Sequence, residues 1–293
     1  MPLRAASIRI DLDAIFGWIV ENWLIFAIIG GVILLGIIVL MVLPTSKIKP
    51  DPKHPVDSPE AADLALGYVQ IDNADGRWND PLASHLDDAP GAREALVELW
   101  GLTSNAEWNE TLDRLTTVRR RRPLWVELLR IRRDAAQRLG RAPSTKQWLE
   151  AIRAAGGSGK GEERAVVDAI TFYEEQFRGV TSKERFPKDA IVTNLDAYAL
   201  NQAVAVATWG VSLGLATPED SRRRIAEIGR IAREEYSSWD DYGRSLVVGR
   251  AMHWSDGVQN ERQVKQSTDA AIAFARAMNP KADGPWAALP WRR

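Results

Sequence analysis

Residues 217–241 read TPEDSRRRIAEIGRIAREEYSSWDD, and this stretch carries the start signals of two consecutive helices. Thr217 and Pro218 are residue types preferred at the cap and the first position of a helix. Ser238 stands in the same capping position before the second helix. Between the two caps, apolar residues recur at helical spacing: Ile225, Ile228 and Ala232. The stretch therefore predicts amphipathic helices that pack through one apolar face.

The same signals recur over the rest of the chain from about residue 58 onward. Three more serines stand where a helix cap is expected, two of them with Glu or Gln three residues later: Ser58, Ser104 and Ser144. No stretch alternates apolar and polar residues as a strand does. Clustered Asn, Asp and Gly residues predict loops within 61–93 and 154–163. We therefore expect an all-α, compact multi-helix domain over 60–293.

A long apolar run near the N-terminus predicts a membrane anchor. Residues 23–43, WLIFAIIGGVILLGIIVLMVL, carry no charged side chain, and a helix of this length matches a hydrocarbon core of about 30 Å. A cleaved signal peptide is the alternative, but its apolar core would be shorter and a small-residue cleavage site would follow. Pro44 follows instead and would end the helix. The sequence thus predicts a single-pass, N-terminal transmembrane helix.

The segments on both sides of this run predict its orientation. Residues 44–59 contain five prolines and predict an extended linker. Lysines near this end of the run outnumber the basic residues near the other end, so we expect the C-terminal domain in the cytoplasm and the N-terminus outside. Residues 1–22 form an N-terminal tail. Its apolar residues fit either an interfacial helix or a helical extension of the span.

The composition excludes several kinds of chemistry. The chain has no cysteine, which excludes disulfides, thiol catalysis and thiolate metal sites. Its formal net charge of -1 argues against a dedicated nucleic-acid binder. His54 lies in the linker without partners, and His85 and His253 have no ligand at metal-binding spacing. The glycine-rich loop 156–161 lacks the spacing of a phosphate-binding loop. We therefore expect no metal, no cofactor and no assembled catalytic residues.

One local excess of positive charge stands out. Between residues 119 and 141 nine arginines face only two acids, Glu127 and Asp134. An apolar stripe runs through the same stretch, so the arginines would cover the other face of an amphipathic helix. This patch is either a solvated face with ion pairs or a surface for anionic lipid headgroups. Its candidate residues are Arg119, Arg120, Arg121, Arg122, Arg130, Arg132 and Arg133.

Several short motifs in the chain point to a known family. They are Leu99-Trp100-Gly101-Leu102, Trp209-Gly210 with Gly214 and Glu219, Tyr236-Ser237-Ser238-Trp239, and Gly249-Arg250 with Trp254. With these motifs the chain resembles, over about residues 95–255, the uncharacterised bacterial family called domain of unknown function 1266. The resemblance implies a compact cytoplasmic helical domain and no established reaction. The membrane expected above would then be the bacterial inner membrane.

The chain departs from that family pattern at one place. Family members tend to carry an Asp and, three residues later, an Arg where this chain has Ala199 and Gln202. If that pair had a chemical role, this chain has lost it. Arg250 is the best remaining candidate for function, because a charged side chain among apolar neighbours needs an acceptor. A structural ion pair with Asp240 or Asp241 is nevertheless favoured over a ligand site.

Three functions are consistent with the sequence. The leading one is a membrane-anchored, cytosol-facing module that interacts with another protein as a regulator or immunity-type partner. The second is an enzyme with a pocket lined by Trp209, Tyr236, Trp239 and Arg250, although a non-enzymatic role is favoured. The third is a sensor of anionic lipid surfaces that uses Arg119–Arg122. The expected partners are therefore the lipid bilayer, a protein and anionic lipid headgroups, and not nucleic acid.

Overall fold

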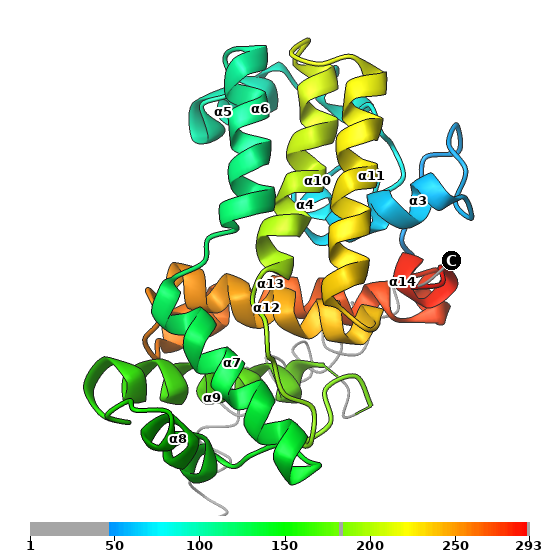
Figure 1. Cartoon of the computed structure of the whole chain (residues 1–293). Helices are drawn as coiled ribbons and strands as arrows, with labels where there is room; N and C mark the ends of the chain where they lie inside the picture. Colours follow the sequence, from blue (N-terminus) through cyan, green and yellow to red (C-terminus); the bar gives the residue numbers. More distant parts are fainter. Residues whose placement is uncertain (1–46, 182–183, 292–293) are drawn as a thin grey trace, which may run out of the picture. The chain divides into compact units, whose positions relative to one another are not determined.

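The computed structural model describes residues 47–181 and 184–291, and over these residues it consists of helices and turns without a strand (Figure 1). The expectation of an all-α domain is confirmed. The helices are α3 (Pro59–Leu64), α4 (Tyr68–Asp72), α5 (Pro90–Trp100), α6 (Asn105–Asp113), α7 (Pro123–Leu139), α8 (Thr145–Ala154), α9 (Gly161–Val180), α10 (Ala197–Ser212), α11 (Pro218–Glu235), α12 (Trp239–Trp254), α13 (Glu261–Ala277) and α14 (Pro285–Ala288). Short 3-10 helices lie at Ala65–Gly67, Ser84–Leu86 and Pro280–Ala282, and a short π-helix lies at Arg114–Val118.

Helix α10 is the centre of the domain. Every residue from Ala197 to Gly210 is buried, because the helix is almost entirely apolar and is covered on several sides. Helices α6, α11 and α12 all pack against it, and α10 and α11 run side by side as a hairpin in Figure 1. The tight turn of this hairpin contains Gly214, whose φ of 71° is readily adopted only by glycine.

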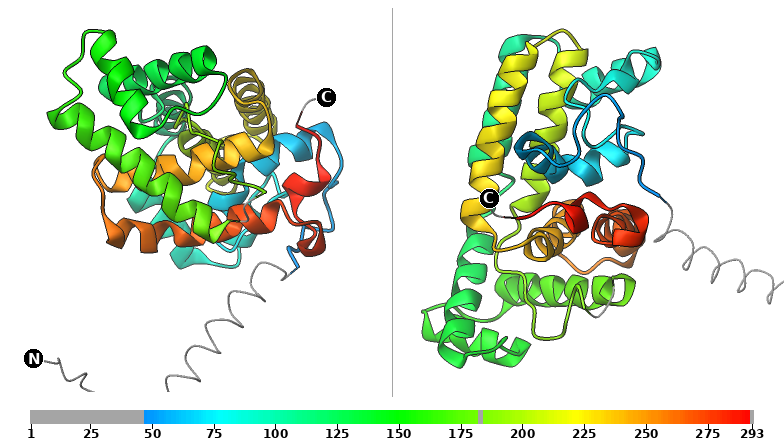
Figure 2. Two further views of the ribbon diagram at one scale, coloured as in Figure 1. Left: turned by 90° about the horizontal axis from the view of Figure 1, so that it is seen from below. Right: turned by 90° about the vertical axis from the view of Figure 1, so that its right-hand side faces the viewer.

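A second pair of helices crosses below this hairpin. Helix α12 packs on α13, and this pair lies between α9 on one side and α4 on the other, as the views in Figures 1 and 2 agree. Helices α7 and α8 pack on each other and on α9, which completes the lower part of the domain in Figure 1. The connection from α6 to α7 therefore passes from the upper part of the domain to the lower part.

The C-terminal residues are fixed to the domain by indole side chains. Trp286 stacks on Trp239 with ring centroids 5.2 Å apart and donates a hydrogen bond to the carbonyl of Ala65 at 2.7 Å. Trp291 lies edge-on to Trp239 and donates to the carbonyl of Tyr236 at 2.8 Å. These buried rings combine large apolar surfaces with satisfied N–H groups, so they anchor residues 280–291 to the core.

The predicted helix caps are confirmed by the structure. The hydroxyls of Ser58, Ser104, Ser144, Thr217 and Ser238 each accept a hydrogen bond from a backbone N–H in the first turn of the following helix. The loop predicted at 154–163 is present over 155–160, between α8 and α9, whereas residues 161–163 already belong to α9. The prediction of a loop over 61–93 is wrong for much of this range. Residues 61–72 are helical and buried, because Leu64, Leu66 and Tyr68 pack into the core.

Residues 47–58 lie against the domain. Ile48 is 5% exposed, and its backbone N–H donates to the carbonyl of Ala282 at 2.8 Å. The side chain of Asn79 donates to the carbonyls of Asp51 and His54 at 2.9 and 3.0 Å. This part of the proline-rich segment is thus held by specific contacts with residues that lie far from it in the sequence.

The expectation of a single-pass membrane protein is corrected. No helix over 47–181 and 184–291 combines the length and the apolar character needed to cross a bilayer. The longest, α9, carries charged side chains along its length, and α10 is apolar but has only 16 residues. The predicted span 23–43 and the tail 1–22 lie outside the described residues. A transmembrane helix, a single-pass arrangement and an inner-membrane location are therefore not supported, and the fold class is an all-α domain.

Candidate functional site

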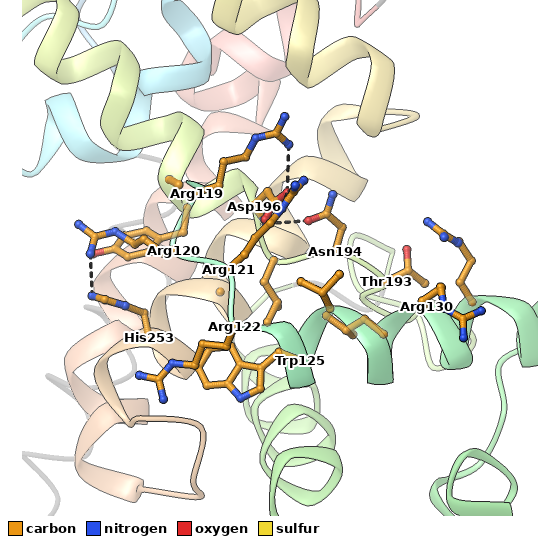
Figure 3. A pocket seen from close by; sticks show the side chains of 17 residues that line it. Arg119, Arg120, Arg121, Arg122, Trp125, Arg130, Thr193, Asn194, Asp196 and His253 are labelled. Carbon is orange, nitrogen blue, oxygen red and sulfur yellow. Dashed lines mark hydrogen bonds and ion pairs between the residues drawn. The ribbon is translucent and has the colours of Figure 1, made fainter. Parts of the chain in front are cut away.

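A pocket lined by arginines lies where three parts of the domain meet (Figure 3). One wall is the connection between Arg114–Val118 and α7, which supplies Arg119–Arg122. The second wall is 193–199, at the start of α10, and the third is α12, which supplies Gly249 and His253. The hollow has a volume of about 240 Å³. Six of its lining residues are arginines and a single one, Asp196, is acidic.

The backbone of the first wall is unusual. Arg119 and Arg120 both have a φ of 55°, in the left-handed region that residues with a side chain seldom occupy. Each such residue costs on the order of 1–3 kcal/mol, and such conformations persist where the surroundings hold them in place. Here the Arg119 side chain donates to the carbonyl of Thr116 at 2.5 Å and pairs with Asp196. The strained turn directs the side chains of Arg119 and Arg120 to different partners, Asp196 and Gln202.

Arg119 and Arg121 are neutralised by acids of the protein. The carboxylate of Asp196, with a side chain 6% exposed, accepts hydrogen bonds from Arg119 at 3.0 Å and from Arg121 at 2.8 Å. Glu235 forms an ion pair with Arg119 as well. The hydrogen bond to Asp196 raises the pKa of Arg121. These four side chains form a structural network in which the charges balance.

Arg120 is different because it has no carboxylate partner among the described residues. Its Nε donates to the side-chain oxygen of Gln202 at 2.7 Å, and its Nη1 lies 3.0 Å from Nε2 of His253. Burial, followed by the positive charges of Arg120 and Arg122, lowers the pKa of His253 to about 4. The histidine is therefore neutral at pH 7. Since a guanidinium can only donate, Nε2 of His253 must accept, which places the ring proton on Nδ1.

Apolar side chains also line the pocket, beside these charges. Trp125, Val126 and Leu129 of α7 line one side, and Trp125 is 6% exposed with the Arg122 guanidinium 4.6 Å from its ring centroid. Tyr198 of α10 also lines the pocket, with the Arg120 guanidinium 5.6 Å from its ring. The pocket therefore combines donors and positive charge with flat aromatic walls.

The structure divides the predicted basic patch into separate roles. Arg119–Arg122 precede α7 and line the pocket instead of covering the face of a helix. Arg130 pairs with Glu127 and Asp134 on the exposed surface, and Arg133 is exposed at the pocket edge. Arg132 is 3% exposed and binds Glu174 through two hydrogen bonds of 2.6 and 2.7 Å. Arg132 is therefore a core residue.

The four residues proposed for an enzyme pocket do not line this one. Trp209 and Trp239 are core side chains, packed on Trp100 and on Trp286. Tyr236 is buried, and its hydroxyl accepts from the backbone N–H of Ala197 at 2.7 Å. Arg250 does not line the pocket either, although its guanidinium lies 5.9 Å from the Tyr198 ring.

The ion pair expected for Arg250 is not formed. No carboxylate among the described residues pairs with this side chain, and Asp240 pairs with Arg185 at 3.4 Å instead. Arg250 is half-buried and lines a shallow hollow with Trp254, which is 56% exposed. Gly249 of α12 lies close to the backbone segment before α10, because a Cβ there would be 2.6 Å from the carbonyl oxygen of Leu195.

Sequence reasoning missed His253, Asp196 and Gln202 as parts of one site. The departure from the family pattern was the one available signal, since Ala199 lines the pocket and Gln202 binds Arg120. Nothing in the sequence placed residue 120 beside residues 202 and 253. Over the described ranges, the one cluster of three side chains spaced to hold a metal ion lies elsewhere, at Asp51, His54 and Asp80.

Comparison with known proteins identifies the family but gives no activity. The family model described as protein of unknown function (DUF1266) matches residues 95–291, about two thirds of the chain. The chain therefore belongs to the DUF1266 family, as its motifs indicated. No curated protein and no solved structure matches it.

Proposed function

We propose that this DUF1266 protein binds a small organic anion, with a phosphate or carboxylate group held at Arg120. The observation that carries the proposal is the half-buried guanidinium of Arg120, which lies in a pocket and has no acid within the described part of the chain to balance it. A buried charge without a counter-charge is costly, because it loses hydration and gains no ion pair in return. An anionic ligand would supply the missing partner.

The hydrogen bonds of Arg120 leave room for such a ligand. A guanidinium has five N–H donors, and here Gln202 and His253 engage Nε and Nη1. Nη2 is therefore available to an oxygen of the ligand. Guanidinium groups bind phosphate and carboxylate particularly well, because their donors match the spacing of the two oxygens.

The charge around the pocket also favours an anion. Arg119 and Arg121 are balanced by Asp196 and Glu235, whereas Arg120 and Arg133 are not paired with any acid of the described ranges. Arg114 lines an adjoining hollow with Arg120 and likewise has no carboxylate partner there. Burial lowers the pKa of Arg120, and the positive charge of Arg114 contributes in the same direction. A guanidinium nevertheless stays protonated, so the site keeps its positive charge.

The apolar walls limit what the rest of the ligand can be. Trp125, Leu129 and Tyr198 offer ring and aliphatic surface beside the donors. A volume of about 240 Å³ lies below the usual range of about 300–1,000 Å³ for drug-sized ligands. A small molecule with one anionic group and one flat apolar group, such as an aromatic phosphate monoester, fits both features.

The other functions receive less support from this geometry. A lipid-surface sensor would leave its arginines free for headgroups, but the Arg119 side chain is 11% exposed, and Asp196 binds both Arg119 and Arg121. A protein-interaction role stays a prediction from the sequence, because no apolar face of the described residues identifies a partner. The pocket is concave and contains the unbalanced charge, so recognition of a small anion is the function it supports best.

Thermal unfolding of the full chain tests the proposal, with phenyl phosphate as the probe and inorganic phosphate for comparison. We expect phenyl phosphate to raise the Tm of the wild-type chain and of the control Arg230→Gln, whose exposed side chain pairs with Glu234 outside the pocket. Arg120→Gln should abolish the rise. Phosphate alone should have a smaller effect, since it lacks the apolar group.

A second arm distinguishes a free anion from a lipid headgroup. Cosedimentation with phosphatidylglycerol vesicles should be the same for the wild-type chain and Arg120→Gln. If phenyl phosphate leaves the Tm unchanged while vesicles bind the wild-type chain and not Arg120→Gln, the ligand is a headgroup and the proposal is wrong.

A further inference from the structure

The turn at residues 51–54 brings three potential metal ligands together, away from the arginine pocket. Asp51 and His54 belong to this turn, and Asp80 approaches them from a loop that follows in the sequence. One ligand atom of each, two carboxylate oxygens and one imidazole nitrogen, lies within 4.8 Å of the others. We propose that Asp51, His54 and Asp80 bind a divalent transition-metal ion, with zinc as the expected metal.

The distances within this group suit coordination better than hydrogen bonding. Nε2 of His54 lies 3.6 Å from Oδ1 of Asp80, which is too long for a hydrogen bond. Zinc binds such nitrogen and oxygen atoms at about 2.0–2.2 Å, so two of its tetrahedral ligands lie roughly 3.3 Å apart. A small adjustment of the side chains would place all three ligand atoms around one ion.

Asn79 holds the ligands in position. This buried side chain accepts from the backbone N–H of Asp51 at 2.7 Å and donates to the carbonyls of Asp51 and His54. The 51–54 turn is thereby fixed beside Asp80. Ordered supporting residues of this kind align the ligands of a metal site and tune its affinity.

Asp80 is fixed from the other side. Its two oxygens accept from the backbone N–H groups of Leu82 and Ser84 at 2.9 and 2.7 Å, and its side chain is 2% exposed. Each carboxylate oxygen has two lone pairs, so these contacts leave one lone pair on each oxygen for a metal. Oδ1 of Asp51 likewise accepts from the N–H of Lys53 at 2.7 Å and keeps a lone pair.

The ligand types and the surrounding charges indicate which ion fits. Imidazole together with carboxylates suits zinc and similar transition metals, whereas magnesium and calcium prefer oxygen ligands alone. Two carboxylates and a neutral histidine balance a divalent cation. Exposed Arg222 lines the adjoining hollow with His54, and its side chain pairs with Glu60. A bound ion would therefore join the proline-rich segment to the 79–84 loop.

Titration of the full chain, free of any polyhistidine tag, with zinc alone tests the proposal. We expect one equivalent of zinc to bind the wild-type chain and to raise its Tm. His54→Gln and Asp51→Asn should each weaken zinc binding at least tenfold. Asp57→Asn, a change of an exposed acid in the same segment, should bind zinc as the wild-type chain does.

Cobalt substitution provides a readout that a loss of stability cannot imitate. Cobalt bound by the wild-type chain should show the intense visible absorption of a four-coordinate site, and His54→Gln should lose it. Zinc binding of equal affinity in His54→Gln and Asp57→Asn, or no binding by the wild-type chain at millimolar zinc, overturns the proposal. So does loss of binding in His253→Gln, which would place the ion elsewhere.

Discussion

The guanidinium of Arg120 lies 3.0 Å from Nε2 of His253, and these two residues come from segments 133 positions apart. The contact joins a permanent cation to a histidine that must stay neutral to accept its hydrogen bond. The hydrogen bond from Arg120 to Nε2 can form only while His253 is unprotonated. The pair therefore makes the pocket sensitive to acid.

The first prediction concerns the dependence of stability on pH. The pKa of His253 is lowered to about 4 in the folded protein, whereas an unperturbed histidine in the unfolded chain titrates near 6.5. Between these values the unfolded chain binds a proton that the folded chain does not. The contribution of His253 to the free energy of unfolding is thus present above about pH 6.5 and is lost as the pH falls towards 4.

The variant His253→Gln isolates this effect from the titration of other groups. Gln keeps an acceptor for Arg120 but does not titrate. As the pH falls below 6.5, the free energy of unfolding of the wild-type chain should therefore decrease relative to that of His253→Gln. Urea unfolding at several pH values measures it. A difference that does not change with pH, or a His253 signal that titrates near 6.5 by NMR, would contradict the assignment.

The second prediction concerns the buried pair of Arg132 and Glu174. Arg132→Met leaves the Glu174 carboxylate buried without its partner, so we expect the free energy of unfolding to fall by about 3–5 kcal/mol. The control is Arg164→Met on α9, which removes an exposed ion pair with Asp168. Its free energy of unfolding should fall by at most about 1 kcal/mol. Chemical denaturation compares them, and equal losses would show that Arg132 is not a core residue.

The third prediction concerns Gly249, where α12 passes close to the backbone of the pocket wall. In Gly249→Ala the new methyl group would lie 2.6 Å from the carbonyl oxygen of Leu195, so the helix or the wall must shift. We expect a loss of about 1–3 kcal/mol in stability, together with weaker anion binding. Leu195 itself lines the pocket, which is why both should change.

Gly91 provides the matched control for this substitution. It lies in α5, is exposed, and has no atom within 4 Å of the position of a Cβ. Gly91→Ala should therefore leave stability unchanged or raise it by about 0.4–1 kcal/mol, since alanine restricts the unfolded chain. Equal effects of the two substitutions would show that the approach of α12 to Leu195 is not tight.

Local signals in the sequence predicted the helices well, because a helix begins where a side chain can cap it. Ser144 illustrates this: its hydroxyl and the Gln147 side chain form the complete capping box that their spacing indicated. Ser104 shows the limit, since Glu107 turns its carboxylate to Thr103 instead of closing the box. Helix identity depends on neighbours in the sequence and could therefore be read from it.

The site could not be predicted in the same way, because it depends on contacts between distant segments. The arginine run was visible, but its division into the balanced Arg119, the unbalanced Arg120 and the buried Arg132 depends on Asp196, Glu174 and the packing of α7. Similarly, the exposed position of Trp254 follows from where α12 ends on the domain, which no local pattern encodes.

The central claim is that Arg120 holds the anionic group of a ligand, and calorimetric titration of phenyl phosphate tests it most directly. The wild-type chain and Arg230→Gln should bind one equivalent with the same Kd. Arg120→Gln should bind at least tenfold more weakly, because a hydrogen bond to a charged group contributes about 1.5–3 kcal/mol. Equal affinity for the wild-type chain and Arg120→Gln, or no detectable binding to the wild-type chain, would contradict the account.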